Sequence, residues 1–509
     1  MNYKQILSFS GKVSFATLLS RILGFCRDVF IARSLGAGLF ADIFFAAFSV
    51  PSIFRRIFTD GALNSSFIPI YKDIDNTDSE TRRNKFSGAA SILIVLCFLL
   101  ITFLGIFFSD FIVQIFFPGF VNFNKKFHLT SNLLKIMFPF LFFISLWGIA
   151  SSILNANNFF FLPAIAPALQ NLAMITALII FLGSSYEKIL FSLAWAVLIG
   201  GLLQFLIQLP LLFKNNFFPI LTNPFKVSEL RNFMLMVGPT ALSIGVLQIN
   251  VLLDRILASF LSVGSISYLY YANRLVQFPH ALISIAVTTV AFPVMSEKKD
   301  EVSRTQSKDT LRESSEILLS VAIPASVGLI ILACPIIELL FKRGEFSNAD
   351  VLSSAKTLQA YSFGIVFFGI NRLIVSAYHA VLEAKYPMRC AYYTLLSNVV
   401  FSLLLVYPFG YTGIAFATSI SSFVNFLLLT RKKSSLEAKI FIPDLFSIVK
   451  KYLLATFVMA LVLFPVNLLF WEKMDTYLNK TLFLFFEIVL STVLYFLIIF
   501  LMKAKSKSK

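Results

Sequence analysis

The chain alternates between long apolar segments and short polar ones along its whole length. Each apolar window is about 20 residues long, enough for a helix to cross the hydrocarbon core of a bilayer. Strands of a membrane barrel would instead give short segments of alternating hydrophobicity. The pattern predicts an all-α polytopic membrane protein with about 14 transmembrane helices, at residues 9–33, 40–70, 86–109, 131–153, 160–182, 189–213, 230–259, 266–295, 312–336, 352–380, 386–408, 411–431, 446–470 and 480–502.

The charged residues between the apolar segments predict how the chain is oriented. An even number of helices places both termini on one side of the membrane. The loops on that side hold most of the basic residues, among them Lys72, Arg82, Lys298, Lys299 and Arg431. Because basic residues collect in cytoplasmic loops, we expect both termini in the cytoplasm.

Three landmarks of the first half return in the second half at an offset of about 224 residues. F-I-P ending at Pro69 matches A-F-P ending at Pro293, and I-F-F-P-G-F ending at Phe120 matches L-L-F-K-R-G-E-F ending at Phe346. L-N-A with Pro163 matches Y-H-A with Pro387. Six helices per copy give two parallel repeats, with a site expected near the membrane midplane between them. The predicted domains are an N-terminal six-helix bundle at 1–225, a C-terminal six-helix bundle at 226–440, and two additional helices with a basic cytoplasmic tail at 441–509. This architecture indicates a transporter that works by alternating access.

The composition narrows the function class. The chain is 58% hydrophobic and 14% charged with a mean hydropathy of +0.83, whereas about a quarter of a soluble domain is charged. The net charge of +17 lies mostly in alternate loops, so we expect no nucleic-acid partner. Four cysteines without a C-x-x-C pair predict no redox or zinc role. Phosphate-loop, serine-hydrolase and zinc-protease motifs are absent from the sequence, which favours a transporter over an enzyme.

The first two predicted helices meet at the turn 36–38 and carry ionisable residues where a lipid-facing helix would hold Leu, Ile and Phe. An ionisable side chain near the bilayer centre costs roughly 2.5–3.5 kcal/mol, so such groups usually face a protein interior or a water-filled cavity. These residues predict a polar cavity lined by the first half: Arg21, Arg27, Asp28, Asp42, Arg55 and Arg56.

Arginine outnumbers carboxylates in this predicted cavity, and a second-half segment adds Arg274 on a polar stripe with Ser267, Tyr270 and Gln277. A guanidinium group binds two phosphate oxygens at once and keeps its proton on burial. The cavity therefore indicates an anionic, diphosphate-bearing substrate, with Asp42 holding an arginine while the site is empty. The alternative is that these charges form ion pairs between helices or, as for Arg27 with Asp28, between neighbours.

The charged segment carries a family resemblance. The run S-R-x-L-G-F-x-R-D from Ser20, then G-A-G, A-D-x-F-F, P-x-x-x-R-R-I-F and G-A-x-x-x-x-F-x-P, resembles the N-terminal signature of the MurJ (MviN) family. These are bacterial lipid II flippases of the multidrug/oligosaccharidyl-lipid/polysaccharide exporter superfamily. The resemblance implies transport of undecaprenyl-diphosphate-linked disaccharide-pentapeptide to the outer leaflet of the bacterial cytoplasmic (inner) membrane, for peptidoglycan synthesis and cell shape.

The resemblance also bears on individual residues. It favours Arg55 as the functional arginine of the second helix, whereas ideal helix geometry favours Arg56. It matches Arg274 to the basic cavity residue of the family's C-terminal half, but relatives carry an acidic residue where this chain has Gln277. In the family, the two additional helices form a groove for the polyprenyl tail.

A second candidate site would bind a cation. Asp254 and Asn250 lie one turn apart, and Asn398 and Thr418 of later helices could complete a set of oxygen ligands. The resemblance implies a sodium site in this region, although the family's second carboxylate near Asn398 is missing. The alternative is a salt bridge of Asp254 with a nearby arginine such as Arg255. No metal site and no cofactor are predicted apart from a coupling ion, sodium or a proton, or the membrane potential.

Three rival functions fit parts of the pattern. A flippase for another polyprenyl-diphosphate-linked oligosaccharide shares the diphosphate. A multidrug or cation exporter shares the architecture but needs an acidic or aromatic cavity. A polyprenyl-phosphate enzyme needs His, Asp or Ser clustered at cytoplasmic helix ends. The expected partners are the lipid-linked peptidoglycan precursor, the phospholipid bilayer and cell-wall synthesis proteins.

Overall fold

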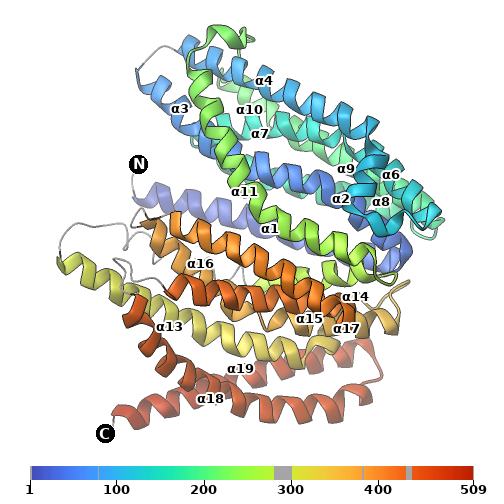
Figure 1. The fold of residues 1–509 in the computed structure, drawn as a ribbon, viewed down its shortest axis with the longest axis vertical. Helices are drawn as coiled ribbons and strands as arrows, with labels where there is room; N and C mark the ends of the chain where they lie inside the picture. Colours follow the sequence, from blue (N-terminus) through green and yellow to red (C-terminus); the bar gives the residue numbers. More distant parts are fainter. Residues whose placement is uncertain are drawn as a thin grey trace. The chain divides into compact units, whose positions relative to one another are not determined.

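The computed structural model describes residues 3–77, 80–279, 301–380, 383, 385–431 and 438–507, and this part of the chain is helical without a strand. The all-α fold class is thus confirmed. The chain forms two compact units, which are described one at a time (Figure 1). Unit 1 comprises Met1–Ile266 and Arg343–Phe346, and unit 2 comprises Ser267–Lys342 and Ser347–Lys509.

Unit 1 contains the helices coloured blue to green in Figure 1. Their bounds are α1 (Tyr3–Leu35), α2 (Leu39–Ile57), η1 (Phe58–Leu63), α3 (Asn64–Thr77), α4 (Glu80–Phe107), α5 (Ser109–Phe116), η2 (Pro118–Phe120), α6 (Asn124–Met137), α7 (Phe140–Ala156), α8 (Phe161–Ile180), α9 (Tyr186–Leu206), α10 (Leu209–Lys214), η3 (Pro224–Lys226) and α11 (Glu229–Ser259).

The turn between α1 and α2 requires glycine. Gly36 has a φ of +62°, in the left-handed region that strains any residue with a Cβ atom. α1 therefore ends at Leu35, and α2 begins after Gly38, which is its N-cap residue. The predicted turn at 36–38 is confirmed.

The segment predicted as one helix at 40–70 is built from three pieces. α2 passes into the six-residue π-helix η1, which continues as α3. Gly61 lies in this wide turn, and a Cβ atom there would lie 2.1 Å from Cδ1 of Ile244 in α11. The glycine thus gives α11 room to pack directly against the π-helix, a type of irregularity that is frequent at functional sites.

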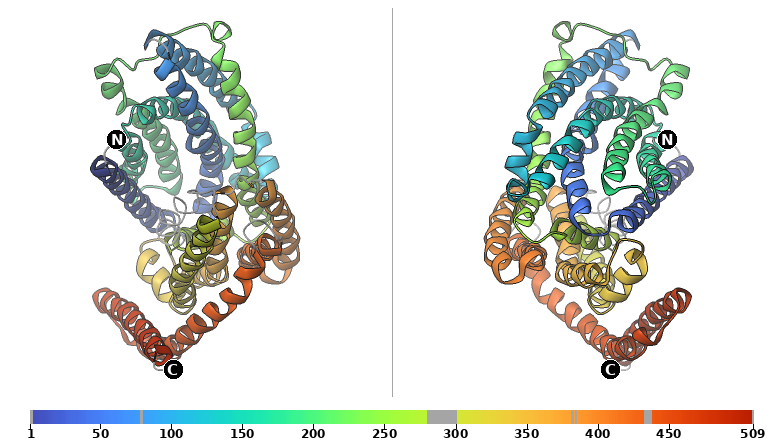
Figure 2. Two further views of the ribbon diagram at one scale, coloured as in Figure 1. Left: turned by 90° about the vertical axis from the view of Figure 1, so that its left-hand side faces the viewer. Right: turned by 90° about the vertical axis from the view of Figure 1, so that its right-hand side faces the viewer.

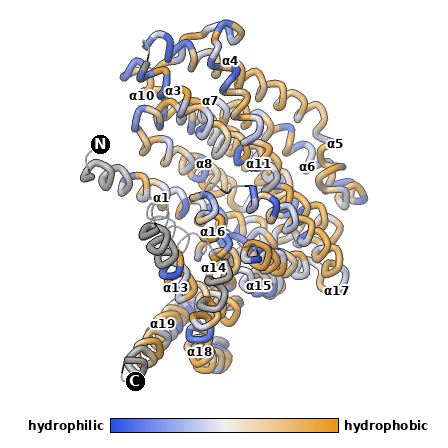
Figure 3. The backbone as a smooth tube through the Cα atoms, turned by 60° about the vertical axis from the view of Figure 1, so that its left-hand side comes forward, coloured by the Kyte–Doolittle hydropathy of each residue, from blue (hydrophilic) through white to orange (hydrophobic). Residues whose placement is uncertain are grey.

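One end of unit 1 is polar. Figure 3 shows hydrophilic residues gathered where α3 ends, α4 begins and α10 leads toward α11. Arg83 is buried there and donates to Asp75 Oδ1 at 2.7 Å, while Arg82 forms an ion pair with Glu229 at the start of α11. The first pair ties the start of α4 to the end of α3, and the second ties it to the first turn of α11.

Unit 2 begins at Ser267, inside the helical segment 265–279. Its further helices are α13 (Glu301–Ile331), α14 (Ala333–Phe341), α15 (Asn348–Ser362), α16 (Ile365–Ala380), α17 (Lys385–Arg431), α18 (Ala438–Phe470), η4 (Trp471–Lys473) and α19 (Tyr477–Lys507). α17 is interrupted at Gly410, where φ is +56°, so the two helices predicted at 386–408 and 411–431 are recognisable within it.

The last two helices pack onto the rest of unit 2 through α13. Figure 2 shows α18 and α19, in red, along the outer side of the yellow and orange helices. Two tyrosines on their buried faces donate hydrogen bonds to α13: Tyr452 to Glu316 Oε1 at 3.0 Å, and Tyr495 to the Ser320 carbonyl at 2.6 Å. Each hydroxyl thus keeps a partner although the ring is buried in an apolar cluster.

Within the described residues, nine helices are long and apolar enough to cross a membrane, or ten when the bent α11 is counted as one span. This agrees with a polytopic protein, and the count of 14 stays a prediction. The end of the helix predicted at 266–295, including Pro293, lies outside the described residues, as do Lys298 and Lys299. The domain boundaries at 225 and 440 also stay predictions.

Candidate functional site

Arg27 is held on the inner face of α1 by two partners. Its Nε and Nη2 donate to Asp28 Oδ1 at 3.0 and 2.6 Å, and its Nη1 donates to Asn171 Oδ1 of α8 at 2.9 Å. Asn171 in turn donates to the Ser20 carbonyl at 3.1 Å, and the guanidinium carbon lies 5.6 Å from the centre of the Phe48 ring. Arg27 is 7% exposed and Asp28 is fully buried. The neighbouring ion pair foreseen as an alternative is therefore present.

Asp42 takes part in a second buried ion pair. Its Oδ2 accepts from Lys126 Nζ of α6 at 3.1 Å and from the Gly264 backbone N–H at 2.8 Å. Asp42 is 1% and Lys126 is 4% exposed, and the ammonium group lies 4.1 Å from the centre of the Phe120 ring. Asp42 thus joins α2 to α6 and to the turn that follows α11.

Two glycine turns of unit 1 dock onto helix ends in the same manner. The Gly119 N–H donates to Ser259 Oγ at 3.1 Å, and a Cβ atom on Gly119 would lie 2.1 Å from the Ser259 carbonyl oxygen at the end of α11. A Cβ atom on Gly344 would lie 2.3 Å from the Arg33 carbonyl oxygen near the end of α1. The Glu345 N–H donates to that same oxygen at 3.0 Å. We call these the reciprocal glycine contacts.

The reciprocal glycine contacts follow the internal repeat. Gly119 belongs to the first copy of the landmark that ends at Phe120, and Gly344 to the copy that ends at Phe346. The first copy packs against the end of α11, and the second copy packs against the end of α1. These two helices are the first helices of the two predicted six-helix bundles. A hydrogen bond from Tyr186 Oη to Glu345 Oε2, 2.7 Å long, adds to the second contact.

The other predicted anion-binding residues differ in exposure. Arg21 and Arg56 are exposed, whereas Arg55 is half-buried. Arg55 is therefore the less exposed of the two adjacent arginines of α2. Arg274 lies in the helical segment 265–279 of unit 2 and is half-buried, and Gln277 is exposed. The buried members of the predicted anion-binding set are thus Arg27, Asp28 and Asp42.

Two of the predicted cation-site residues come together inside unit 2. Asn398 is 2% exposed, and its Nδ2 donates to Thr418 Oγ1 at 3.4 Å and to Ser421 Oγ at 3.3 Å. Asp254 is half-buried in α11 of unit 1. The neighbouring Arg255 donates to the Phe45 carbonyl at 2.7 Å. The contact of Asn398 with Thr418 agrees with the predicted set, and the binding of a cation stays a prediction.

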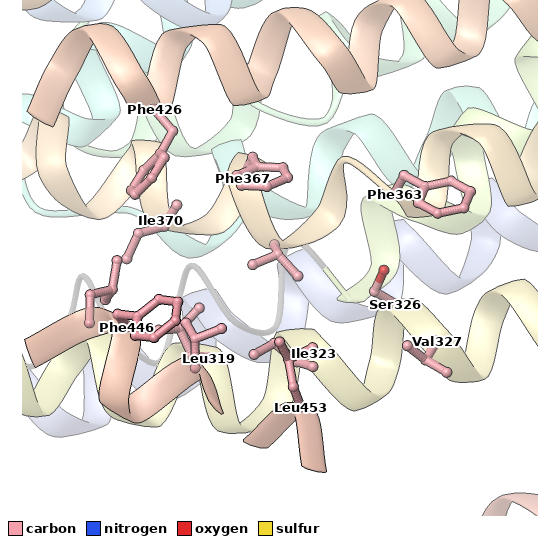
Figure 4. A pocket seen from close by; sticks show the side chains of 13 residues that line it. Leu319, Ile323, Ser326, Val327, Phe363, Phe367, Ile370, Phe426, Phe446 and Leu453 are labelled. Carbon is pink, nitrogen blue, oxygen red and sulfur yellow. The ribbon is translucent and has the colours of Figure 1, made fainter. Parts of the chain in front are cut away.

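Unit 2 also contains an apolar cavity of about 400 Å³ between α13, α16, α17 and α18. Figure 4 shows the rings of Phe367, Phe426 and Phe446 around it, with Ile370 between them. Ser326 is the one polar residue of the lining, and its hydroxyl donates to the Ser362 carbonyl at 2.6 Å. The wall therefore offers hydrocarbon contacts and suits an alkyl or isoprenoid chain.

Sequence reasoning missed Lys126 and Asn171. Lys126 lies between two predicted helices, where a basic residue is expected to be exposed, but it lies on the buried side of the first turn of α6. The run N-K-K-F at 124–127 offered a signal only in that adjacent helix residues point about 100° apart, so the two lysines do not share one direction. Asn171, an uncharged residue among the apolar ones of α8, accepts a hydrogen bond from Arg27.

Comparisons with known proteins agree on one family. The profile described as "Lipid II flippase MurJ" matches residues 31–487. The "Probable lipid II flippase MurJ" of Buchnera aphidicola subsp. Acyrthosiphon pisum (strain APS) is 38% identical over 484 residues, covering 95% of this chain and 94% of the relative. The "Lipid II flippase MurJ" of Burkholderia cenocepacia is 30% identical, covering 84% and 83% of the two chains.

Solved structures give the same result. "Lipid II flippase MurJ, inward closed conformation" matches with a TM-score of 0.81 and 30% identity, covering 96% of this chain and 97% of that one. An inward-facing multidrug resistance MATE family transporter of the MOP superfamily matches with a TM-score of 0.65 at 13% identity, covering 84% and 96%, which shows a shared fold. The apolar helices agree with a multi-pass protein of the bacterial inner membrane. The chain belongs to the MurJ family of lipid II flippases.

Proposed function

We propose that this protein flips lipid II, the undecaprenyl-diphosphate-linked peptidoglycan precursor, from the cytoplasmic to the outer leaflet of the inner membrane. The observation that carries the proposal is the family match over nearly the whole chain, at 38% identity to a MurJ relative. Two features of the structure support it. Unit 1 holds arginines and carboxylates inside apolar helices, and unit 2 holds a cavity suited to an isoprenoid chain.

The proposed mechanism assigns the diphosphate to arginines. The assigned arginines are Arg21, Arg55, Arg56 and Arg274, which are exposed or half-buried. Arg27 is assigned as well, and its guanidinium donates to Asp28 and Asn171. A bound diphosphate would therefore compete with these acceptors for Arg27. In this proposal, Arg27 changes partner during the cycle, and the change couples substrate binding to movement of α1 against α8.

Asp42 and the reciprocal glycine contacts would act when the outer side of the protein closes and opens. Both termini are proposed to lie in the cytoplasm, because the basic loops share their side, which puts the end of α1 and the start of α2 on the outer side. The contacts around Asp42 and Gly344 would then hold the outer side closed, and opening outward would break them. In this proposal the protein is a transporter without enzymatic activity and works by alternating access. A coupling ion or the membrane potential drives the cycle.

The test is replacement of a cell's own flippase by this protein. Cells depleted of their flippase should resume peptidoglycan synthesis and export lipid II when the chain is expressed. Arg274→Glu should abolish rescue at normal protein level in the membrane, because a carboxylate repels the diphosphate. Lys188→Glu, a charge reversal at an exposed position, should rescue like the wild type. Rescue by Arg274→Glu would exclude anion capture at Arg274.

A second arm of the same experiment separates lipid II from other substrates. Proteoliposomes that contain the protein are given lipid II or another polyprenyl-diphosphate-linked oligosaccharide. Transport of both would favour a flippase of broader specificity, and transport of the second alone would overturn the proposal. Co-purification with cell-wall synthesis proteins would test the proposed protein partners.

A further inference from the structure

Glu487 is a carboxyl group buried inside the apolar helix pair α18–α19. It is fully buried in a helix whose other central residues are apolar or hydroxyl-bearing. Asn467 of α18 donates from Nδ2 to Glu487 Oε2 at 3.1 Å. Within the described part of the chain, the other oxygen, Oε1, has no hydrogen-bond partner and Glu487 has no ion-pair partner.

Charged groups on the surrounding elements have other partners. The titratable side chains that the structure describes on α14, α18 and α19, apart from Glu487, are Cys334, Glu338, Lys450, Lys451, Tyr452, Tyr477, Lys480 and Tyr495, and the adjoining face of α13 adds Glu316. Lys480 lies two turns before Glu487 and donates to Glu338 Oε1 at 2.8 Å. Glu316 accepts from Tyr452. An ionised carboxylate at Glu487 would lose its hydration and keep one amide as its hydrogen-bond donor. Burying the charged form therefore costs far more free energy than burying the neutral acid.

We propose that Glu487 and Asn467 form a proton-binding site within the C-terminal helix pair. Oε2 acts as the carbonyl oxygen that accepts from Asn467, and Oε1 carries the proton. During the transport cycle the O–H bond on Oε1 is made with a proton from water and broken again, returning the proton to water. A proton fits better than a metal ion, because the described residues around the carboxyl supply no further acidic ligand.

A cavity lies next to this carboxyl along α19, with Glu487 itself behind its lining residues. Ile488 and Ser491, which follow Glu487 by one residue and by one turn, line a space of about 290 Å³ between α13, α18 and α19. The same wall carries the hydroxyl groups of Thr492 and Tyr495. These hydroxyls donate to the backbone carbonyls of Ile488 and Ser320, and their oxygens stay available as acceptors. In the proposal, a water molecule held by them brings the proton to Glu487 and takes it away.

The site is tested first by infrared spectroscopy of the purified protein, which needs no transport. At neutral pH the wild type should show the C=O band of a protonated carboxylic acid in apolar surroundings. Glu487→Gln should lose the band, and Asn467→Ala should move it to higher frequency because the carbonyl oxygen loses its donor. Glu472→Gln, the same change at an exposed position of η4, should leave it in place. Absence of the band from the wild type, or its persistence in Glu487→Gln, would overturn the proposal.

A second measurement tests exchange of the proton and rests on the proposed flippase function. The flipping rate in proteoliposomes is followed against pH. The wild type should depend on pH, and Glu487→Gln should flatten the profile while Glu472→Gln keeps it. If the pH dependence of flipping were unchanged in Glu487→Gln, the contact between Glu487 and Asn467 would be a structural hydrogen bond only. This result would overturn proton exchange at Glu487. If the wild type flips nothing, the function proposal fails, and the infrared band still decides proton binding.

Discussion

The reciprocal glycine contacts predict a graded loss of stability when methyl groups are added to glycines of unit 1. Gly344→Ala combines two penalties. Its φ of +57° disfavours a Cβ atom by about 1–2 kcal/mol, and that atom would lie 2.3 Å from the Arg33 carbonyl oxygen, where ordinary contacts begin near 3.4 Å. Overpacking costs about 1–3 kcal/mol, so the sum is about 2–5 kcal/mol.

Three other glycines separate the two penalties. Gly183 has a φ of +81° and nothing within 4 Å of the added atom, so Gly183→Ala should cost about 1–2 kcal/mol from the backbone alone. Gly119→Ala meets the Ser259 carbonyl oxygen at 2.1 Å without a positive φ, so it should cost about 1–3 kcal/mol from the clash. Gly238 lies inside α11 with nothing within 4 Å, and alanine should be neutral or stabilise by about 0.5–1 kcal/mol.

The assay is thermal unfolding of the purified protein in detergent, where 1 kcal/mol corresponds to about 2–4 °C for a domain of this size. The expected order of loss is Gly344 first, then Gly119 and Gly183, with Gly238 at or above the wild type. If Gly344→Ala melted together with Gly183→Ala, the Arg33 oxygen would not resist the added methyl group, and the docked turn would be looser than described.

Three further changes test the buried polar contacts. Lys126→Met should lower stability by about 3–5 kcal/mol because it leaves the buried Asp42 carboxylate without its ammonium partner, and the double change with Asp42→Asn should recover part of the loss in a thermal double-mutant cycle. Burial raises the pKa of Glu338, but hydrogen bonds from two lysines and a tryptophan outweigh it and lower the pKa to about 2. Its stabilisation of about 3 kcal/mol should therefore be full above pH 4.5 and disappear as the pH falls toward 2, and unfolding at pH 3 and pH 6 should differ less in Lys480→Met. Asn171→Ala removes an acceptor of the buried arginine of α1 and should lower the melting temperature by the equivalent of about 1–3 kcal/mol, and an unchanged temperature would show that the contact contributes little.

The sequence was most informative for features of the fold that depend on one local property of the chain. Apolar length predicted the spans, and the glycines at 36 and 410 marked breaks that depend on backbone freedom alone. The pairing of Arg27 with Asp28 was foreseen as an alternative because the residues are neighbours. The pairing of Lys126 with Asp42 was not, since it depends on how two helices 84 residues apart are rotated toward each other. The π-helix η1, which changes the helical phase between α2 and α3, is likewise a feature that sequence periodicity does not report.

The reciprocal glycine contacts also say something about how the chain arose. In an isologous two-fold dimer, the same two surfaces meet twice: a residue of the first subunit contacts a site on the second, and the equivalent residue of the second contacts the equivalent site on the first. Gly119 on the end of α11 and Gly344 near the end of α1 reproduce it within one polypeptide. A pair of separate six-helix subunits could have met through these turns before their genes were fused, with the glycines already serving as the surface of self-recognition.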